Sequence, residues 1–157
     1  MRKPRLLKNG ASYHVTARAN RQELIFEENS IKKLFLEILK DAKKKYKFQI
    51  FNFCIMNNHI HLLIKPGIKV DLSRILQWTL SIFAVRYNKI YKYRGHVFYD
   101  RFHSKIIDDI RQFTDTFNYI SDNPVKANIV NTAENYEFNG LWFIKFKIFD
   151  IVEPPSP

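Results

Sequence analysis

Apolar and polar residues alternate over residues 11–18, a period of two that predicts a β-strand. A helical period follows, and Ser30 is a suitable N-cap for a helix that runs to about Tyr46. The apolar face of this helix consists of Ile31, Leu34, Phe35, Ile38 and Leu39. Residues 48–56 and 59–64 are apolar runs of strand length, and Asn57-Asn58 between them predicts a tight turn because asparagine tolerates positive φ.

The second half of the chain begins with a longer helix. Asp71 is placed to cap a helix over residues 72–91, and Gly95 is expected to end it. The inward positions of this helix are Leu76, Leu80, Phe83 and Tyr87. Residues 97–98 and 104–107 are expected to be extended, the latter as a fourth strand. A last helix over residues 111–122 is expected to stop at Asn123-Pro124, because the residue before a proline is pushed out of the helical conformation.

The order of these elements, β-α-β-β-α-β, predicts the fold class. It is α+β, a ferredoxin-like split β-α-β antiparallel sheet with helices on one face, plus a C-terminal tyrosine-bearing helix. The length fits one domain over residues 1–150, and residues 151–157 are expected to form a disordered tail. Because this fold supports many unrelated activities, the function has to be argued from the site residues.

Charge gives the first indication of function. The chain has 26 Lys and Arg against 15 Asp and Glu, a net charge of +11, and such an excess favours a nucleic acid as partner. The alternative is a globular protein that is merely basic. No apolar run approaches the length of a membrane helix, so we expect a cytoplasmic protein with no membrane partner. A single cysteine, Cys54, excludes an internal disulfide and a multi-thiolate zinc site, and it is expected to be a buried filler.

Two histidines in one predicted strand are the first candidate site residues. Side chains alternate across a strand, so His59 and His61 project from the same face, where we expect them to be exposed. Two imidazoles in this arrangement can share one divalent metal ion. The alternative is that one of the two only completes a polar network.

Tyr119 and Asn123 are the second pair. They are four residues apart and therefore lie on one face of the last helix. Phe113 and Phe117 can supply the apolar contacts of that helix, which leaves Tyr119 available to a cleft; the alternative is a core tyrosine with its hydroxyl at the rim. The amide oxygen of Asn123 is a suitable third ligand for Mg²⁺ or Mn²⁺.

Four motifs in this order resemble a known family. The first motif consists of residues 13–18 together with residues 25–26. The other three are residues 56–64, residues 95–107 and residues 119–127. The pattern resembles the single-tyrosine HUH transposases and, most closely, the REP-associated tyrosine transposases. Two departures are Asn57, where many relatives have proline, and residues 136–140, which match a Trp-Ser-rich element only loosely.

The resemblance implies a mechanism and a partner. Tyr119 would attack a phosphodiester of single-stranded or hairpin DNA, giving a 5′-phosphotyrosine and then strand transfer. His59, His61 and Asn123 would hold a divalent ion, Mg²⁺ or Mn²⁺. Both a monomer and a homodimer that exchanges the tyrosine helix stay open. Among the other tyrosines, Tyr13 is the one serious competitor for the role of nucleophile.

Basic residues outside this site are candidates for DNA binding. Lys92, Arg94, Arg101 and Lys105 on the domain are expected to contact phosphates. Arg2, Lys3 and Arg5 form an N-terminal arm that either lies in a minor groove or is a disordered, solvated start. Aromatic residues in segments 91–94 and 98–102 either stack on unpaired bases or belong to the core.

Two other functions compete with the transposase interpretation. A 2H-type phosphoesterase needs two H-x-T/S strands, and His14-Val15-Thr16 supplies the first while the second is missing. A catalytically silent nucleic-acid-binding regulator of the same fold is the other alternative, and the presence of the tyrosine together with all three candidate ligands argues against it.

Overall fold

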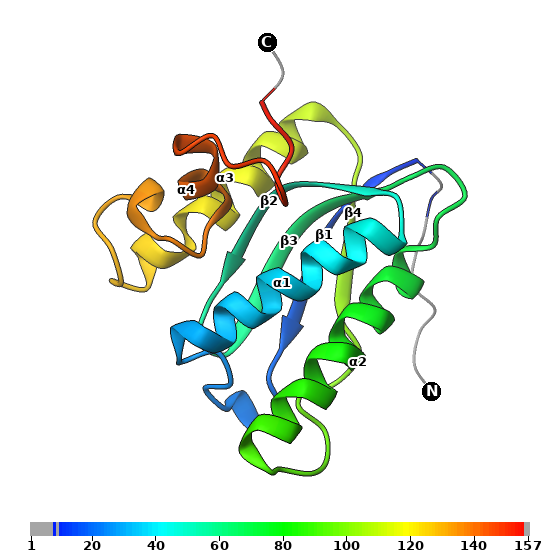
Figure 1. The fold of residues 1–157 in the computed structure, drawn as a ribbon. Coiled ribbons are helices and arrows are strands. Elements are labelled where there is room, and N and C mark those ends of the chain that lie inside the picture. Colours follow the sequence, from blue (N-terminus) through cyan, green and yellow to red (C-terminus); the bar gives the residue numbers. More distant parts are fainter. Residues whose placement is uncertain (1–7, 9, 156–157) are drawn as a thin grey trace.

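Four antiparallel strands form one sheet in the order β2-β3-β1-β4 in the computed structural model, which describes residue 8 and residues 10–155 (Figure 1). The strands are β1 (Ser12–Arg18), β2 (Phe48–Ile55), β3 (His59–Pro66) and β4 (His103–Ile107). The helices are η1 (Asn20–Gln22), α1 (Asn29–Lys45), α2 (Leu72–Tyr91), α3 (Ile110–Lys126), η2 (Ala133–Asn135) and α4 (Gly140–Lys145). This order and topology confirm the predicted ferredoxin-like arrangement.

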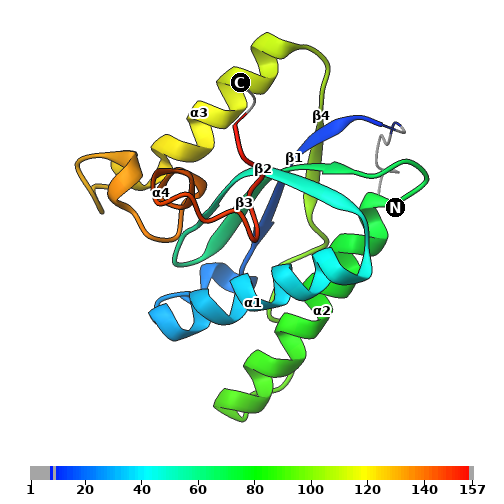
Figure 2. The ribbon, with the colours of Figure 1, turned by 45° about the horizontal axis from the view of Figure 1, so that its top comes forward.

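The two faces of the sheet differ in chemistry. On β1, Tyr13, Val15 and Ala17 are buried, whereas the alternate residues are partly or fully exposed. Helices α1 and α2 lie side by side on the buried face, and α3 and α4 lie on the other side of the sheet, toward its β2 edge (Figure 2). Because α3 and α4 pack mainly on β2, the second face keeps an open region over β1, β3 and β4.

The start of α1 and the residue that ends α2 differ from the sequence prediction. Helix α1 begins at Asn29 with Glu28 as N-cap, so Ser30 lies within the first turn and is not the cap. Asp71 caps α2 as predicted, with its carboxylate accepting from the Ser73 N–H. That helix ends at Tyr91, as predicted, but the left-handed residue that ends it is Lys92 and not Gly95.

The predicted stop of the last helix at Pro124 is wrong. Helix α3 runs from Ile110 to Lys126 and contains Pro124. A proline removes only its own N–H, and the next helical turn is completed by bonds from Ala127 N–H to the Asn123 carbonyl and from Ile129 N–H to the Pro124 carbonyl. Pro124 is buried in this position, so its packing offsets part of the cost.

Helix α3 is fixed to the sheet by the buried side chain of Asn52. A bulge in β2 between Ile50 and Asn52 turns this residue toward α3. Its Nδ2 donates to the carbonyl of Phe117 at 2.9 Å and to Ser121 Oγ at 2.8 Å. Gly140 covers the same amide, and a Cβ there would overlap Asn52 Oδ1, so only glycine allows α4 to approach this closely.

The C-terminal segment is more ordered than predicted. Ile151 and Val152 are fully buried, and Val152 forms a parallel bridge with Ile50 of β2. Lys43 binds the Glu153 carboxylate at 2.7 Å. The prediction of a disordered tail from residue 151 is therefore wrong for residues 151–153, because two apolar side chains complete the core at the edge of the sheet. Residues 156–157 lie outside the described part of the chain.

Replacing Asn52 by alanine is expected to lower the free energy of unfolding by about 2 to 3 kcal/mol, since buried partners on α3 and on the β2 backbone lose their hydrogen bonds. Urea denaturation followed by circular dichroism measures the change. Gln49→Ala, at an exposed position of the same strand, is the matched control and should stay within about 0.5 kcal/mol of the wild type. Equal stability of the two variants would contradict the anchoring role of Asn52.

Candidate active site

His59 and His61 lie next to each other on the second face of the sheet. Their ring centroids are 4.9 Å apart, as the alternation of the strand predicts. In the β1–β3 pairing, His59 faces Arg18 and His61 faces Thr16. His61 is only 3% exposed, so the expectation of two exposed histidines is wrong for this one. The rings of Tyr119 and His14 lie close to His61, which accounts for its burial.

His14 is a third histidine at this site, and sequence reasoning did not assign it there. Its Nε2 lies 3.0 Å from Nδ1 of His61, and Thr16 Oγ1 lies 3.3 Å from the same atom. The alternation along β1 indicates that His14 and Thr16 lie on one face of the sheet. Only the pairing of β1 with β3 shows that this face is the one that carries His61. His14 can therefore hold the orientation of the His61 ring.

The neighbours of the two imidazoles favour one ring nitrogen of each as a ligand atom. Asn58 Oδ1 lies 2.7 Å from Nδ1 of His59, so that nitrogen donates its proton and Nε2 carries the free electron pair. The contact from Nδ1 of His61 to His14 suits the same tautomer. An outer hydrogen bond of this kind fixes the ring orientation of a metal-binding histidine.

Burial keeps these imidazoles neutral. Desolvation, helped by the charge of Arg18, lowers the pKa of His59 to about 4. Desolvation lowers the pKa of His61 to about 3, with smaller contributions from His59, His14 and Arg18. A neutral imidazole has a free electron pair at physiological pH, which metal binding requires.

Tyr119 extends from α3 over these histidines. Its ring centroid lies 5.7 Å from that of His61 and 5.8 Å from that of His14, both in edge-on geometry. The side chain is 47% exposed, so the alternative of a core tyrosine is wrong. Lys126, two turns further along α3, places its Nζ 5.3 Å from the centre of the Tyr119 ring. The phenol is thus open to solvent on one side and bordered by a cation.

Asn123 lies one turn after Tyr119 on α3. Its Nδ2 donates to the carbonyl of Tyr119 at 3.4 Å. Within residues 8 and 10–155, no three His, Cys, Asp or Glu side chains are grouped so that they could hold a metal ion. A metal site here would therefore need a donor of another kind, and two neutral imidazoles with the amide oxygen of Asn123 would be a donor set that suits Mg²⁺ or Mn²⁺.

Tyr13 does not compete with Tyr119. It is buried on the opposite face of the sheet, at 2% exposure, and its hydroxyl donates to the carbonyl of Lys8 at 2.8 Å. Cys54 is likewise buried, and desolvation raises the pKa of its thiol to about 12, so its predicted role as a filler is confirmed.

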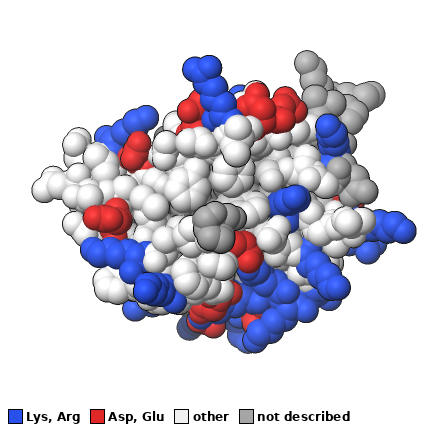
Figure 3. All heavy atoms as spheres, turned by 90° about the horizontal axis from the view of Figure 1, so that it is seen from above, with Lys and Arg blue, Asp and Glu red and all other residues white. Residues whose placement is uncertain are grey.

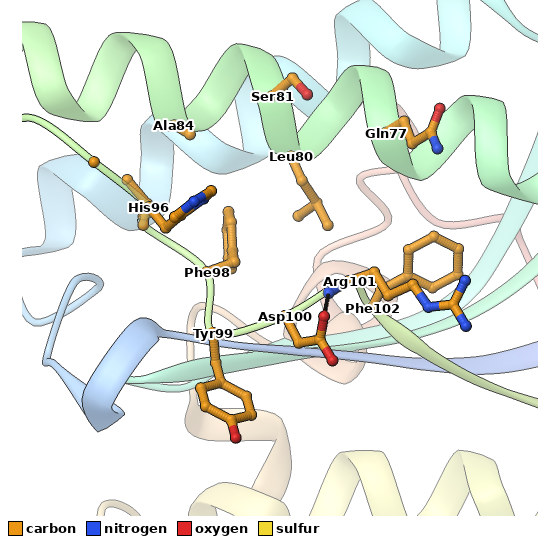
Figure 4. A pocket seen from close by; sticks show the side chains of 12 residues that line it. Gln77, Leu80, Ser81, Ala84, His96, Phe98, Tyr99, Asp100, Arg101 and Phe102 are labelled. Carbon is orange, nitrogen blue, oxygen red and sulfur yellow. Dashed lines mark hydrogen bonds between the residues drawn. The ribbon is translucent and has the colours of Figure 1, made fainter. Parts of the chain in front are cut away.

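The predicted DNA-binding residues fall in different places. Lys105 of β4 pairs with His14 and lies exposed on the same face as the histidines. Lys92 and Arg94 follow the end of α2, in the helix layer on the other side, and Arg101 lines a cavity next to α2 (Figure 4). The candidates of the N-terminal arm, Arg2, Lys3 and Arg5, lie outside the described residues. Lys and Arg side chains gather along one edge of the face seen in Figure 3.

The aromatic residues of segment 98–102 are divided between the core and the surface. Phe98 points toward α2 and packs against Phe83 with ring centroids 5.8 Å apart, and Phe102 is 4% exposed. Tyr99 points the other way and is 71% exposed (Figure 4). The core alternative is therefore right for Phe98 and Phe102, and Tyr99 is the aromatic side chain of this segment that stays available for stacking.

The site has paired histidines on an open sheet face with the tyrosine of α3 above them, and the family match places the chain in a class of DNA-processing proteins. The family model of the IS200-like transposases matches residues 8–123, and the chain belongs to that family. This membership decides against the 2H phosphoesterase alternative. No curated protein matches the chain, and no helix among the residues described is both long and apolar enough to cross a membrane.

Two solved structures show the same fold. A REP-associated tyrosine transposase bound to a REP hairpin has a TM-score of 0.77 and 15% sequence identity, over 99% of this chain and 92% of that chain. A proposed transposase from Deinococcus radiodurans R1 has a TM-score of 0.54 and 13% identity, over 78% of this chain and 97% of that one.

The depressed histidine pKa values make stability dependent on pH. In metal-free buffer with a chelator, the unfolded chain takes up protons on His59 and His61 below pH 6.5, whereas the folded chain does so only near pH 4 and 3. Lowering the pH from 7 to 4 therefore favours unfolding. We expect His61→Ala to flatten this dependence by up to about 1.4 kcal/mol per pH unit.

Urea titrations at several pH values measure the slope of this dependence. His103→Ala removes an exposed histidine from β4 and is the matched control. A His61→Ala protein with the wild-type slope would show that His61 is not held neutral by the fold.

Proposed function

We propose that this protein is a single-tyrosine HUH endonuclease and strand transferase of the REP-associated type. The observation that carries the proposal is the position of Tyr119, half exposed and within 6 Å of two neutral histidine rings contributed by two other elements. Three elements far apart in sequence converge on this point. Core packing does not require a half-exposed phenol over one buried and one partly buried imidazole.

The reaction begins with attack of the Tyr119 oxygen on the phosphorus of a DNA phosphodiester. The phenol gives up its proton to solvent and the P–O bond to Tyr119 forms as the bond to the 3′ oxygen breaks. That oxygen takes up a proton from solvent and leaves as a 3′-hydroxyl. Phenol with a pKa near 10 is a weak nucleophile. The ammonium group of Lys126 lies 5.3 Å from the centre of the Tyr119 ring, so a cation borders the attacking side chain.

His59, His61 and Asn123 would hold the divalent ion. The chemistry that a bound Mg²⁺ or Mn²⁺ supplies is neutralisation of charge on the non-bridging phosphate oxygens, which lowers the repulsion felt by the phenolate. His14 and Asn58 orient the two imidazoles through their Nδ1 atoms. The covalent phosphotyrosine keeps the energy of the broken phosphodiester, so a 3′-hydroxyl of a second strand can reverse the reaction and complete strand transfer.

Single-stranded or hairpin DNA is the proposed substrate. The phosphate has to reach a tyrosine over an open sheet face, and an unpaired strand adapts to that surface more easily than a rigid duplex. The net charge of +11 supports a DNA partner, as does the REP hairpin bound to the structural relative. Helix α3 packs on β2 of its own chain, so a monomer carries all the proposed residues and an exchanged homodimer is the alternative.

Tyr119→Phe is expected to abolish covalent attachment to DNA while binding and stability stay close to those of the wild type, because the ring remains and only the attacking oxygen is lost. The substrate is a labelled pool of DNA hairpins with randomised single-stranded flanks, incubated with Mn²⁺ and resolved on a denaturing gel. His59→Ala should also lose the adduct, and its loss should not be restored by raising the DNA concentration.

An adduct formed by Tyr119→Phe would contradict the assignment, and peptide mass spectrometry of that adduct would identify the true nucleophile. A wild-type protein that binds the pool but forms no adduct with either Mn²⁺ or Mg²⁺ would favour the silent regulator instead.

A further inference from the structure

A cleft of about 450 Å³ opens at the end of β1, and the proposed mechanism does not use it. It is lined by Arg18, Ala19, Arg21, Gln22 and Tyr99. Two of these five residues are arginines, one is an exposed aromatic, and none of the five is acidic. This composition suits an anionic ligand with a flat ring.

The cleft adjoins the candidate active site. Arg18 faces His59 in the β1–β3 pairing, and its charge contributes to the low pKa of that histidine. The Ala19 N–H donates to the carbonyl of Asn58 at 2.8 Å, and Asn58 in turn contacts His59. The floor of the cleft is therefore tied directly to the turn that carries the proposed metal ligand.

The backbone around the cleft is held in an unusual conformation. Arg21 and Gln22 both have a φ of 55°, in the left-handed region that side chains other than glycine and asparagine rarely adopt. Asn20 holds this turn from outside, because its N–H donates to the carbonyl of Val97 at 2.8 Å. Two strained residues in succession, kept in place by the surrounding chain, are typical of a functional site.

Tyr99 forms the other wall of the cleft. Its N–H donates to the carbonyl of Arg18 at 2.9 Å, which places segment 97–99 beside the end of β1. Phe98 points into the core next to it, whereas the Tyr99 ring points away from α2 and is 71% exposed (Figure 4). An exposed ring on a fixed backbone is a suitable platform for stacking a nucleobase.

We propose that this cleft is a subsite for one unpaired nucleotide of the DNA strand, next to the phosphodiester that Tyr119 attacks. The base stacks on Tyr99, and the phosphate of that nucleotide lies between Arg18 and Arg21. This inference rests on the proposed function, since it places the nucleotide relative to the cleaved bond. It also fits the proposed preference for an unpaired strand, because the faces of a base inside a duplex are covered by the neighbouring base pairs and are not free to stack on Tyr99.

Binding is measured with the Tyr119→Phe protein, so that no cleavage occurs. Fluorescence anisotropy compares a DNA hairpin that has single-stranded flanks with the same hairpin without flanks. Tyr99→Ala should weaken binding of the flanked hairpin by roughly tenfold and leave binding of the unflanked hairpin unchanged. Tyr99→Phe, which keeps the ring, is the matched control and should bind both like its parent.

The role of Arg21 is tested by Arg21→Asn, because asparagine accepts the left-handed backbone and lacks the guanidinium group. For the flanked hairpin, the log–log dependence of affinity on salt should become flatter by about one unit. Arg74→Ala removes an exposed arginine of α2 and should keep the slope of its parent.

Photocross-linking locates the nucleotide. 5-Iodo-deoxyuridine is placed at one flank position at a time, and mass spectrometry identifies the attached residue. We expect cross-links to Tyr99 from one position within two nucleotides of the bond that wild-type protein cleaves.

Tyr99→Ala binding with the affinity of its parent, or cross-links to Tyr99 spread evenly along the flank, would overturn the subsite. If the wild type still forms its covalent adduct in that case, only the subsite fails. If the adduct is absent while Tyr99 discriminates flanked from unflanked DNA, the subsite stands as a binding feature and the proposed catalysis fails.

Discussion

The buried amide of Asn52 fixes α3 against the sheet, and the position of Tyr119 depends on this contact. Its hydrogen bonds reach Phe117 and Ser121, the residues two before and two after the tyrosine. Asn139 adds a bond from its Nδ2 to the Ser121 carbonyl at 2.9 Å, so the C-terminal segment closes the same network. Hydrogen bonds between fixed partners determine the position of α3 along β2. Apolar packing alone would define this position less precisely.

The fold separates its structural and chemical functions between the two faces of one sheet. The face under α1 and α2 carries a continuous apolar core, in which even a tyrosine is buried. The other face is only partly covered, and there the neighbouring strands place His14, His59 and His61 together. Because the imidazoles are desolvated while the phenol above them is half exposed, the site combines neutral imidazoles with a tyrosine that solvent can reach.

Much of this arrangement could be predicted from the sequence. The alternation along β3 was sufficient to place His59 and His61 on one face, and helical spacing was sufficient to pair Tyr119 with Asn123. His14 was not assigned to the site because its contact with His61 depends on strand register, which one sequence does not determine. The end of α3 was predicted too early, because the expectation that a helix stops before a proline does not take the burial of Pro124 into account. The left-handed conformation of Arg21 was not predicted, because nothing in the local sequence indicates it.

The central claim, that the docking of α3 brings Tyr119 to a metal held by the histidine pair, is tested most directly by paramagnetic NMR. With tyrosine rings isotopically labelled, Mn²⁺ should broaden the Tyr119 signal before that of Tyr136, which lies in the core with its hydroxyl bound to the Ile55 carbonyl. His59→Ala should remove this selective broadening. If Mn²⁺ left Tyr119 sharp, or broadened it equally in His59→Ala, the metal would not lie between the histidine pair and the tyrosine, and the account would be contradicted.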